Sequence, residues 1–192
     1  MTSLEHLDPA NYLRTPWKNG RGVLVDIARQ GQGWDGAGLI WHYGRTAIVE
    51  PGPFSDLSGY DRLQVVIRGR GLVLVTPAGD IDLREPFRPH RYDGGMPIVT
   101  RLEQGAVEVA NLIADRRKVA IDLRVASSGD VVPAAPGEHI VHAAADSASV
   151  MVSDETCPLL EDHAVRVRCA METSIRVKSG RVLIASVYPL AA

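Results

Sequence analysis

The stretch that decides the fold is residues 63–75, which read LQVVIRGRGLVLV. Two apolar runs rich in valine, isoleucine and leucine flank a short glycine turn, and this arrangement is typical of a β-hairpin. Residues 173–185, which read TSIRVKSGRVLIA, have the same build. The recurrence predicts a chain with two related halves, each of them made of strands.

The rest of the sequence follows the same pattern. Short apolar runs alternate with Gly, Pro, Asp and Ser, and a helical period is nearly absent. One short helix is expected at residues 158–163. Strands are predicted at residues 22–28, 39–49, 63–68, 72–76, 80–83, 97–102, 106–114, 118–126, 139–143, 149–153, 165–170, 174–178 and 181–188.

So many strands in one open sheet would leave exposed edges, and closed or stacked sheets avoid them. We therefore expect an all-β fold of two small β-barrels in tandem, over residues 1–126 and 127–192. The boundary is expected near residues 123–136, where serines, a glycine and two prolines interrupt the strand pattern. The alternatives are barrels that exchange terminal strands, one large β-sandwich, or a single domain over residues 1–192.

The composition excludes several classes of partner. The 192 residues carry a formal net charge of -2 and no basic run, which argues against nucleic acid and anionic lipid. No apolar run is long enough to cross a bilayer, and residues 1–9 lack the apolar core of a secretory signal. A cytoplasmic protein without a membrane partner is expected. Its two cysteines, Cys157 and Cys169, are expected to be thiols.

Two segments have the composition of loops that hold a ligand: residues 15–22, TPWKNGRG, and residues 52–62, GPFSDLSGYDR. Arginine offers a planar fork to a carboxylate, lysine a point charge, and asparagine both a donor and an acceptor. These segments favour a site for a small acidic molecule. The alternative is that Asp61 and Arg62 form an ion pair that stabilises a turn, while Lys18 and Asn19 cap another. The candidate ligand-binding residues are Trp17, Lys18, Asn19, Arg45, Ser55, Asp61, Arg62 and Asn111.

No metal, cofactor or catalytic residue is predicted. The histidines do not form an H-x-H pattern, and His139 and His142 are three residues apart, so a strand would point them to opposite faces. No serine lies in a G-x-S-x-G elbow, and neither cysteine has the context of a nucleophile. The glycines of residues 19–22 lack the spacing of a phosphate-binding loop.

At these residues the chain resembles the HutD/Ves family of bacterial proteins. The likeness rests on T-P-W-K-N-G-x-G at residues 15–22 with Asp26-Ile27-Ala28 after it, on Trp41, on G-P-F-S-x-x-x-G-x-D-R at residues 52–62, and on Asn111-Leu112. It extends from about residue 5 to residue 190. The resemblance implies a bicupin, with two cupin-like (RmlC-like jelly-roll) barrels in one chain, and a homodimer. It also implies a small-molecule binder that modulates histidine utilisation, with formylglutamate or a related acidic intermediate as the ligand and no established enzyme activity.

The chain departs from the family pattern at several positions. Arg21 replaces a glycine, His42 stands where an arginine commonly follows the tryptophan, and Val109-Ala110 replace an Asp-Phe pair. A protein-interaction module that uses an exposed barrel edge has no distinctive sign in the sequence, and two other functions remain open. One is a non-catalytic binding protein in which Lys18, Asn19, Ser55, Arg62 and Asn111 orient an acidic metabolite. The other is a cupin-type enzyme, either an isomerase or a metal-dependent oxygenase whose ligands would be Glu138, His139 and His142.

Overall fold

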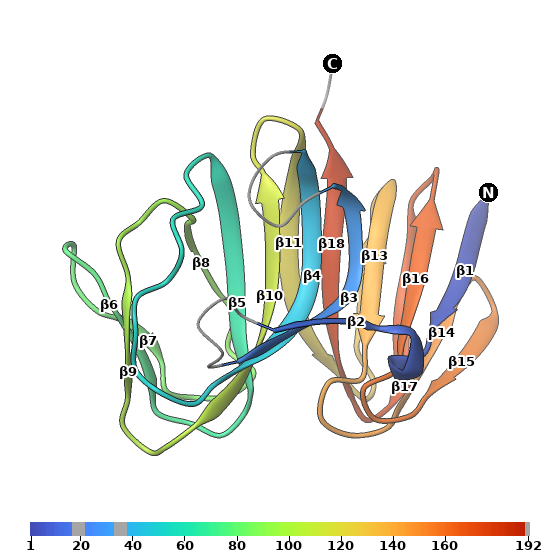
Figure 1. The fold of residues 1–192 in the computed structure, drawn as a ribbon. Helices are drawn as coiled ribbons and strands as arrows, with labels where there is room; N and C mark the ends of the chain where they lie inside the picture. Colours follow the sequence, from blue (N-terminus) through green and yellow to red (C-terminus); the bar gives the residue numbers. More distant parts are fainter. Residues whose placement is uncertain (17–21, 33–37, 191–192) are drawn as a thin grey trace. The chain divides into compact units, whose positions relative to one another are not determined.

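The computed structural model describes residues 1–16, 22–32 and 38–190, and within them the protein is all-β (Figure 1). The strands form four antiparallel sheets, and one turn of 3-10 helix, η1 (Pro9–Asn11), accompanies them. The chain divides into two compact units. The central unit spans Leu13–Val119, and the terminal unit combines Met1–Tyr12 with Ala120–Ala192.

The central unit consists of a six-stranded and a three-stranded sheet. The six-stranded sheet has the order β2-β3-β4-β10-β5-β8, and the three-stranded sheet has the order β7-β6-β9 (Figure 1). The strands of the first are β2 (Leu13–Pro16), β3 (Val23–Gly31), β4 (Leu39–Ile48), β5 (Tyr60–Arg68), β8 (His90–Asp93) and β10 (Val107–Asp115). Those of the second are β6 (Leu72–Val75), β7 (Ile81–Leu83) and β9 (Val99–Leu102).

The core of the central unit lies where these two sheets face each other. Val66 and Val109 of the larger sheet and Leu72, Leu74 and Leu83 of the smaller one are all fully buried. Burying each such side chain contributes about 1.5 to 3 kcal/mol. Because successive side chains of a strand point to opposite faces, one face of each sheet contributes these residues to a shared core.

The terminal unit also has two sheets, five-stranded in the order β1-β16-β13-β18-β11 and four-stranded in the order β12-β17-β14-β15. Its core contains Val141, Val150, Val167, Ile175 and Ile184, which come from both sheets. The first sheet is built from β1 (Thr2–Leu7), β11 (Val119–Ser127), β13 (Gly137–His142), β16 (Ala164–Cys169) and β18 (Arg181–Pro189). The second is built from β12 (Val131–Ala134), β14 (Ala148–Val152), β15 (Glu155–Leu159) and β17 (Thr173–Ser179).

The first strand of the chain completes the terminal unit rather than the central one. β1 pairs with β16 in register from Thr2 opposite Cys169 to Leu7 opposite Ala164. The Tyr12 hydroxyl donates a hydrogen bond of 2.8 Å to the carbonyl of Asp162. The division expected after residue 126 keeps residues 1–12 with the N-terminal half. The compact units differ from it, because β1 supplies an edge strand to the terminal unit.

The two glycine turns that suggested hairpins are corners between sheets. β5 lies in the six-stranded sheet and β6 in the three-stranded sheet, and β17 and β18 are likewise divided between two sheets. Gly69 and Gly180 adopt positive φ angles of 74° and 76°, which favour glycine at a sharp bend. The hairpin prediction is therefore wrong at both places. At the first corner the chain passes from the six-stranded to the three-stranded sheet, and at the second it passes from the four-stranded to the five-stranded sheet. The two similar segments therefore do not occupy equivalent positions in the two units.

The expected closed barrels are not confirmed, because each unit is a pair of open sheets. The helix expected at residues 158–163 is also wrong. Pro158 lies within β15, an edge strand of the four-stranded sheet. An edge strand tolerates a residue without an N–H group, since one side of its backbone has no neighbour to pair with.

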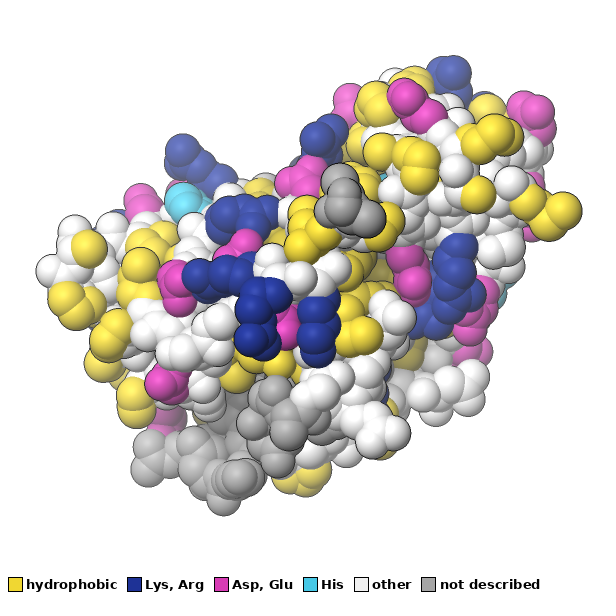
Figure 2. Space-filling view, turned by 90° about the horizontal axis from the view of Figure 1, so that it is seen from above, with side chains coloured by type: hydrophobic (Ala, Val, Ile, Leu, Met, Phe, Trp, Pro, Cys, Tyr) yellow, Lys and Arg dark blue, Asp and Glu magenta, His cyan; other side chains and the backbone are white. Residues whose placement is uncertain are grey.

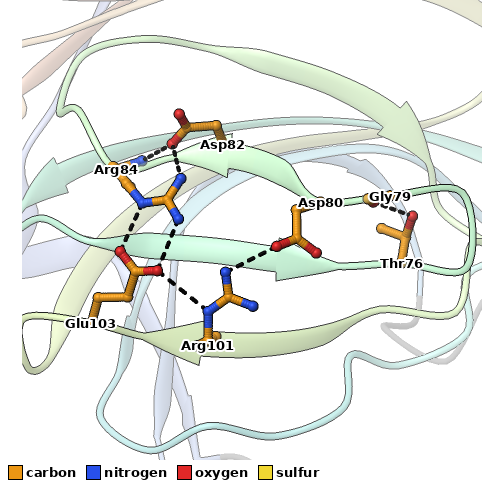
Figure 3. Close-up of polar contacts among 7 residues, drawn as sticks. All are labelled: Thr76, Gly79, Asp80, Asp82, Arg84, Arg101 and Glu103. Atoms are coloured by element: carbon orange, nitrogen blue, oxygen red, sulfur yellow. Dashed lines mark hydrogen bonds and ion pairs between the residues drawn. The ribbon is translucent and has the colours of Figure 1, made fainter.

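Charged side chains link the two outer strands of the three-stranded sheet, β7 and β9, across the central β6 (Figure 3). Arg84 donates two hydrogen bonds to Glu103, of 2.7 and 2.8 Å, and Arg101 contacts both Glu103 and Asp80. The Arg84 side chain lowers the pKa of Glu103. Because these groups are largely exposed, solvent screens them and each pair adds little stability. Figure 2 shows the same mixing of signs on one face of the molecule, where Lys and Arg side chains lie beside Asp and Glu side chains.

A buried carboxylate near the end of β10 is expected to make the fold sensitive to acid. The side chain of Asp115 is 2% exposed, and hydrogen bonds from the Arg117 side chain help to hold its pKa at about 2. A lowered carboxyl pKa stabilises the fold above the ordinary value and loses that contribution as the pH falls through about 2. We expect the urea midpoint of the wild type to fall between pH 4 and pH 2, and that of Asp115→Asn to fall less. Glu103→Gln is the exposed control, and an equal fall in wild type and Asp115→Asn would contradict the expectation.

No helix of the described residues is long and apolar enough to cross a membrane.

Candidate functional site

One face of the six-stranded sheet in the central unit carries a group of buried polar side chains. The pairing places Arg62 of β5 opposite Ile113 of β10 and Tyr92 of β8. It places Asn111 of β10 opposite Gln64 of β5 and Gly44 of β4. Residues directly opposite in a sheet point to the same side, so these side chains share one face. We call this group the polar face, and its members are Asp26, His42, Arg62, Gln64, His90, Tyr92 and Asn111.

Arg62 is the buried cation of the polar face. It is only 7% exposed, and its guanidinium lies over two aromatic rings, 4.7 Å from the centroid of Phe54 and 5.2 Å from that of Tyr92. Such cation–π contacts stabilise an arginine that has lost its water. Within the described ranges, the Arg62 Nε has no hydrogen-bond acceptor and no carboxylate pairs with the side chain. The cation is thus held in place by rings rather than by an opposite charge.

Residues 15–22 and 52–62 are the first and second signature segments, and the second positions the Phe54 ring. The backbone N–H of Phe54 donates to the carbonyl of Ile98, and that of Leu57 donates to the carbonyl of Gly94, both at 2.9 Å. Gly52 is tied to Thr100 by a backbone hydrogen bond and by the Thr100 hydroxyl. These hydrogen bonds therefore fix residues 52–57 onto the segment between β8 and β9 and onto β9 itself, and Phe54 of this loop covers Arg62 with its aromatic ring.

The neighbouring polar groups are arranged as donors and acceptors around this cation. The Tyr92 hydroxyl donates a hydrogen bond of 2.6 Å to the Gln64 Oε1. Burial raises the pKa of Tyr92 to about 12 although Arg62 opposes the shift, so the hydroxyl stays protonated. In the described chain, the buried Asn111 Oδ1 and His90 Nε2 have no hydrogen-bond partner. Buried polar atoms are usually satisfied, and leaving one unpaired costs about 1 to 3 kcal/mol.

The far end of the polar face holds a histidine and a carboxylate. The His42 Nε2 lies 2.9 Å from the Asp26 Oδ1, and the side chains are 1% and 8% exposed. Arg29, which is partly exposed, lies 3.6 Å from the other oxygen of Asp26. A Cβ atom at Gly44 would lie 2.6 and 2.8 Å from two atoms of the His42 ring. The imidazole therefore occupies the space that a side chain at position 44 would fill.

The structure brings together two of the residues predicted from sequence, Arg62 and Asn111. Arg45 and Asp61 lie on the opposite face of the same sheet, where Arg45 pairs with Glu108 and Asp61 with Arg91 and Arg116. Ser55 is exposed on the loop before β5. The alternative of an Asp61–Arg62 ion pair is wrong, because adjacent residues of a strand point to opposite faces. Trp17, Lys18 and Asn19 lie outside the described residues.

Sequence reasoning missed Phe54, Gln64, His90, Tyr92 and the His42–Asp26 pair. One signal could have found part of them: Arg62 and Gln64 are two residues apart in an otherwise apolar strand, so both interrupt the same face. The other members come from β3, β4 and β8. Only the register of the sheet brings them beside Arg62.

His139 of β13 forms contacts inside the terminal unit. The His139 Nδ1 lies 2.9 Å from the Ser186 Oγ, and its Nε2 lies 2.9 Å from the Ala135 carbonyl. A carbonyl only accepts, so Nε2 carries the proton and Nδ1 accepts from the serine. Burial lowers the pKa of His139, which favours this neutral form. Among the described residues, no group of three or more His, Cys, Asp or Glu side chains is arranged to hold a metal ion.

A groove with a volume of about 550 Å³ lies against the loop of residues 52–57. Its walls come from the signature loop at Pro53, Phe54 and Asp56, from the end of β6, and from the segment before β9. Phe54 therefore both contacts Arg62 and lines the groove. This residue links the buried cation to a hollow on the surface of the central unit.

Comparison with known proteins gives the chain relatives over nearly its whole length. A solved conserved protein of unknown function from Pseudomonas aeruginosa PAO1 is 21% identical, covers 98% of this chain and 100% of its own, and has a TM-score of 0.85. HutD from Pseudomonas fluorescens SBW25, solved in a formate condition, is 26% identical with the same coverage and a TM-score of 0.83.

A curated relative, an uncharacterised 21.2 kDa protein in the hutC 3' region of Pseudomonas putida, is 35% identical over 114 residues. That match spans 59% of this chain and 59% of the relative. Two more distant structures, a salicylate 1,2-dioxygenase mutant from Pseudoaminobacter salicylatoxidans and the protein Ylba from E. coli, reach TM-scores of 0.55 and 0.70 at 6% and 7% identity, and this likeness shows the fold alone. The model of the HutD family matches residues 9–185, and the chain therefore belongs to the HutD family.

Proposed function

We propose that this protein is a non-catalytic binding protein of histidine utilisation that takes a small acidic metabolite at the polar face. Formylglutamate or a related acidic intermediate of histidine degradation is the proposed ligand. Membership of the HutD family and the position of the Pseudomonas putida relative in a hutC region support the pathway. The chemistry of the polar face supports the class of ligand.

The observation that carries the proposal is the buried Arg62. A guanidinium is never neutral at physiological pH, and burying a charge without a partner is costly. In the described part of the chain, this guanidinium contacts two aromatic rings but no carboxylate. A ligand carboxylate would accept from the edge of the guanidinium, and such a charge-assisted hydrogen bond is among the strong ones.

The polar atoms beside Arg62 narrow the class of ligand further. The Asn111 Oδ1 is buried and needs a donor, whereas the Arg62 Nε needs an acceptor. A molecule that satisfies both carries a carboxylate together with an N–H or O–H group. An N-acylated amino acid has this combination. Lys18 and Asn19 are proposed to add a cation and an amide from the first signature segment.

We also propose the finer architecture and the setting that the family resemblance implies. The two units would be divergent copies of one cupin-like module, since each is a pair of antiparallel sheets around one core. The chain would act in the cytoplasm as a homodimer, without nucleic acid, membrane, metal or cofactor.

Titration calorimetry with three metabolites tests the proposed function. Purified protein is titrated with formylglutamate, urocanate and histidine. We expect saturable heat from formylglutamate, weaker heat from urocanate, which lacks the amide, and none from histidine, whose ammonium group would approach Arg62. The absence of heat from all three acids, with the protein shown to be folded by circular dichroism, would contradict the proposal.

A further inference from the structure

We propose that β1 pairs with β1 of a second copy of this chain, so that two five-stranded sheets join into one continuous sheet. β1 (Thr2–Leu7) is the outer strand of the five-stranded sheet of the terminal unit (Figure 1). A strand at the edge of a sheet offers unpaired N–H and C=O groups to another strand. The inference rests on the homodimer proposed above and gives it an interface, which involves residues of the terminal unit alone.

The hydrogen bonds of β1 decide which of its backbone groups point outward. The N–H of Ala170 donates to the carbonyl of Met1 at 3.4 Å, which continues the register of β1 and β16 by one position. Bonding alternates between the two sides of an antiparallel strand, so the odd-numbered residues of β1 bond to β16. The residues whose N–H and C=O groups point away from β16 are Thr2, Leu4 and His6.

The other side of β16 gives the same alternation. The N–H of Ala143 donates to the carbonyl of His163 at 3.0 Å, so the odd-numbered residues of β16 bond to β13. Its even-numbered residues therefore bond to β1, and they stand opposite the odd-numbered residues of β1. In the described chain, the outward residues Thr2, Leu4 and His6 make no hydrogen bond or ion pair.

The other sheet of the terminal unit protects its edges, whereas β1 does not. The outer strands of the four-stranded sheet are β12 and β15, and they contain Pro133 and Pro158 respectively. A proline lacks the N–H group and discourages the addition of a further strand. β1 has no proline among its six residues, so it keeps a complete set of groups for pairing.

The outward residues select the register of a two-fold dimer. With the two-fold axis at Leu4, Thr2 faces His6 of the second copy, and Leu4 faces Leu4. Each such pair exchanges two hydrogen bonds, so every outward group of both strands finds a partner. An axis at Ser3 would leave His6 without a partner, and an axis at Glu5 would place two carboxylates opposite each other. The axis at Leu4 is therefore the favoured register.

The side chains of β1 fit this register on both faces of the sheet. Leu4 is partly buried against the core of the terminal unit, and Leu4 of the second copy would extend the same apolar contact. On the opposite face, Ser3 stands across from Glu5 of the second copy. The Glu5 Oε2 lies 3.3 Å from both Arg166 and Arg168 of its own chain, so its charge is compensated before the copies meet.

Sedimentation velocity of the full chain measures the association. A six-residue seam lies at the small end of protein interfaces, so we expect a reversible dimer with a dissociation constant on the order of 10 μM. His6→Pro removes an outward N–H group and keeps the bonds between β1 and β16. Each copy loses one hydrogen bond to the other, which should raise the dissociation constant roughly 5- to 150-fold. His6→Ala is the matched control, because it keeps the N–H group and should dimerise as wild type does.

A second variant tests the register without altering the backbone. Ser3→Glu places a carboxylate opposite Glu5 of the second copy, and we expect the dissociation constant to rise roughly 2- to 30-fold. Within its own chain the new carboxylate stands opposite Arg168, so β1 stays attached to β16. Ser3→Gln adds a side chain of the same length without the charge and should match wild type. High salt should reduce the effect of Ser3→Glu.

Amide exchange in D2O resolves the seam residue by residue. Heteronuclear NMR follows the exchange at protein concentrations well below and well above the dissociation constant. We expect the amides of Leu4 and His6 to become protected only at the higher concentration, because their partners belong to the second copy. The amides of Glu5 and Leu7 should be protected at both concentrations, since their partners lie in β16 of the same chain.

Three outcomes would overturn the proposal. A chain that sediments as a monomer far above the expected dissociation constant would leave the edge of β1 to an extended segment of a different protein. A dimer that responds to neither His6→Pro nor Ser3→Glu would show that the copies meet at another surface, and the homodimer itself would stand. Protection of Leu4 and His6 that does not change with concentration would exclude the second copy as their partner. Arg62 belongs to the central unit, so none of these results bears on the binding of the acidic metabolite.

Discussion

Replacing Arg62 with methionine is expected to weaken binding of the acidic metabolite by about 1.5 to 3 kcal/mol, the usual contribution of a hydrogen bond to a charged group. This corresponds to roughly a 10- to 150-fold rise in Kd. Methionine keeps an unbranched side chain against the rings of Phe54 and Tyr92 but removes the cation. Calorimetry with formylglutamate measures the change.

The same variant should leave the thermal transition unchanged or raise it. Wild type buries a cation that has no carboxylate partner in the described chain, and an apolar group of similar shape avoids that cost. Arg91→Met is the matched control, because Arg91 is a partly exposed arginine that pairs with Asp61 on the neighbouring strand. Unchanged affinity in Arg62→Met would remove the central support for an acidic ligand.

Gly44→Ala is expected to have the largest effect on stability, a loss of about 1 to 3 kcal/mol in the free energy of unfolding from overpacking. The added Cβ would lie 2.4 Å from the Val25 carbonyl oxygen and 2.6 Å from the His42 ring. The backbone oxygen belongs to β3, so the two strands must separate or the ring must leave Asp26. Urea unfolding followed by circular dichroism measures the loss.

Gly52→Ala is the control for this substitution. No heavy atom lies within 4 Å of a Cβ built at Gly52, so the same chemical change should be nearly neutral there. If Gly44→Ala unfolds at the wild-type midpoint, the packing of His42 against position 44 is not tight.

The residue chemistry of the site was partly predictable from sequence. Arg62 and Asn111 stand in recognisable motifs, and their charge and amide groups pointed to an acidic ligand before any strand was placed. The sequence could not show that Arg45 and Asp61 lie on the opposite face from Arg62 and Asn111, because the face to which a strand residue points depends on register. Asp26, His42 and Tyr92 share a face with Arg62 only because five strands pair in one register. No local signal in the sequence encodes such long-range pairing.

The strand content was also predictable, whereas the connections were not. A glycine between two apolar strands fits a hairpin and a corner between sheets equally well, and Gly69 and Gly180 make corners. Edge strands were the ones most easily missed. β1 is short and largely polar, and β15 contains Pro158, so neither reads as a strand until its single neighbour is known.

The pairing of β1 with β16 has a consequence for synthesis on the ribosome. The Tyr12 hydroxyl bonds to a carbonyl 150 residues later, so the leading segment emerges long before its partner exists. The central unit, Leu13–Val119, lies in the sequence between the two parts of the terminal unit. It can therefore fold while the terminal unit is still incomplete. Until translation reaches β16, the leading strand must wait unpaired.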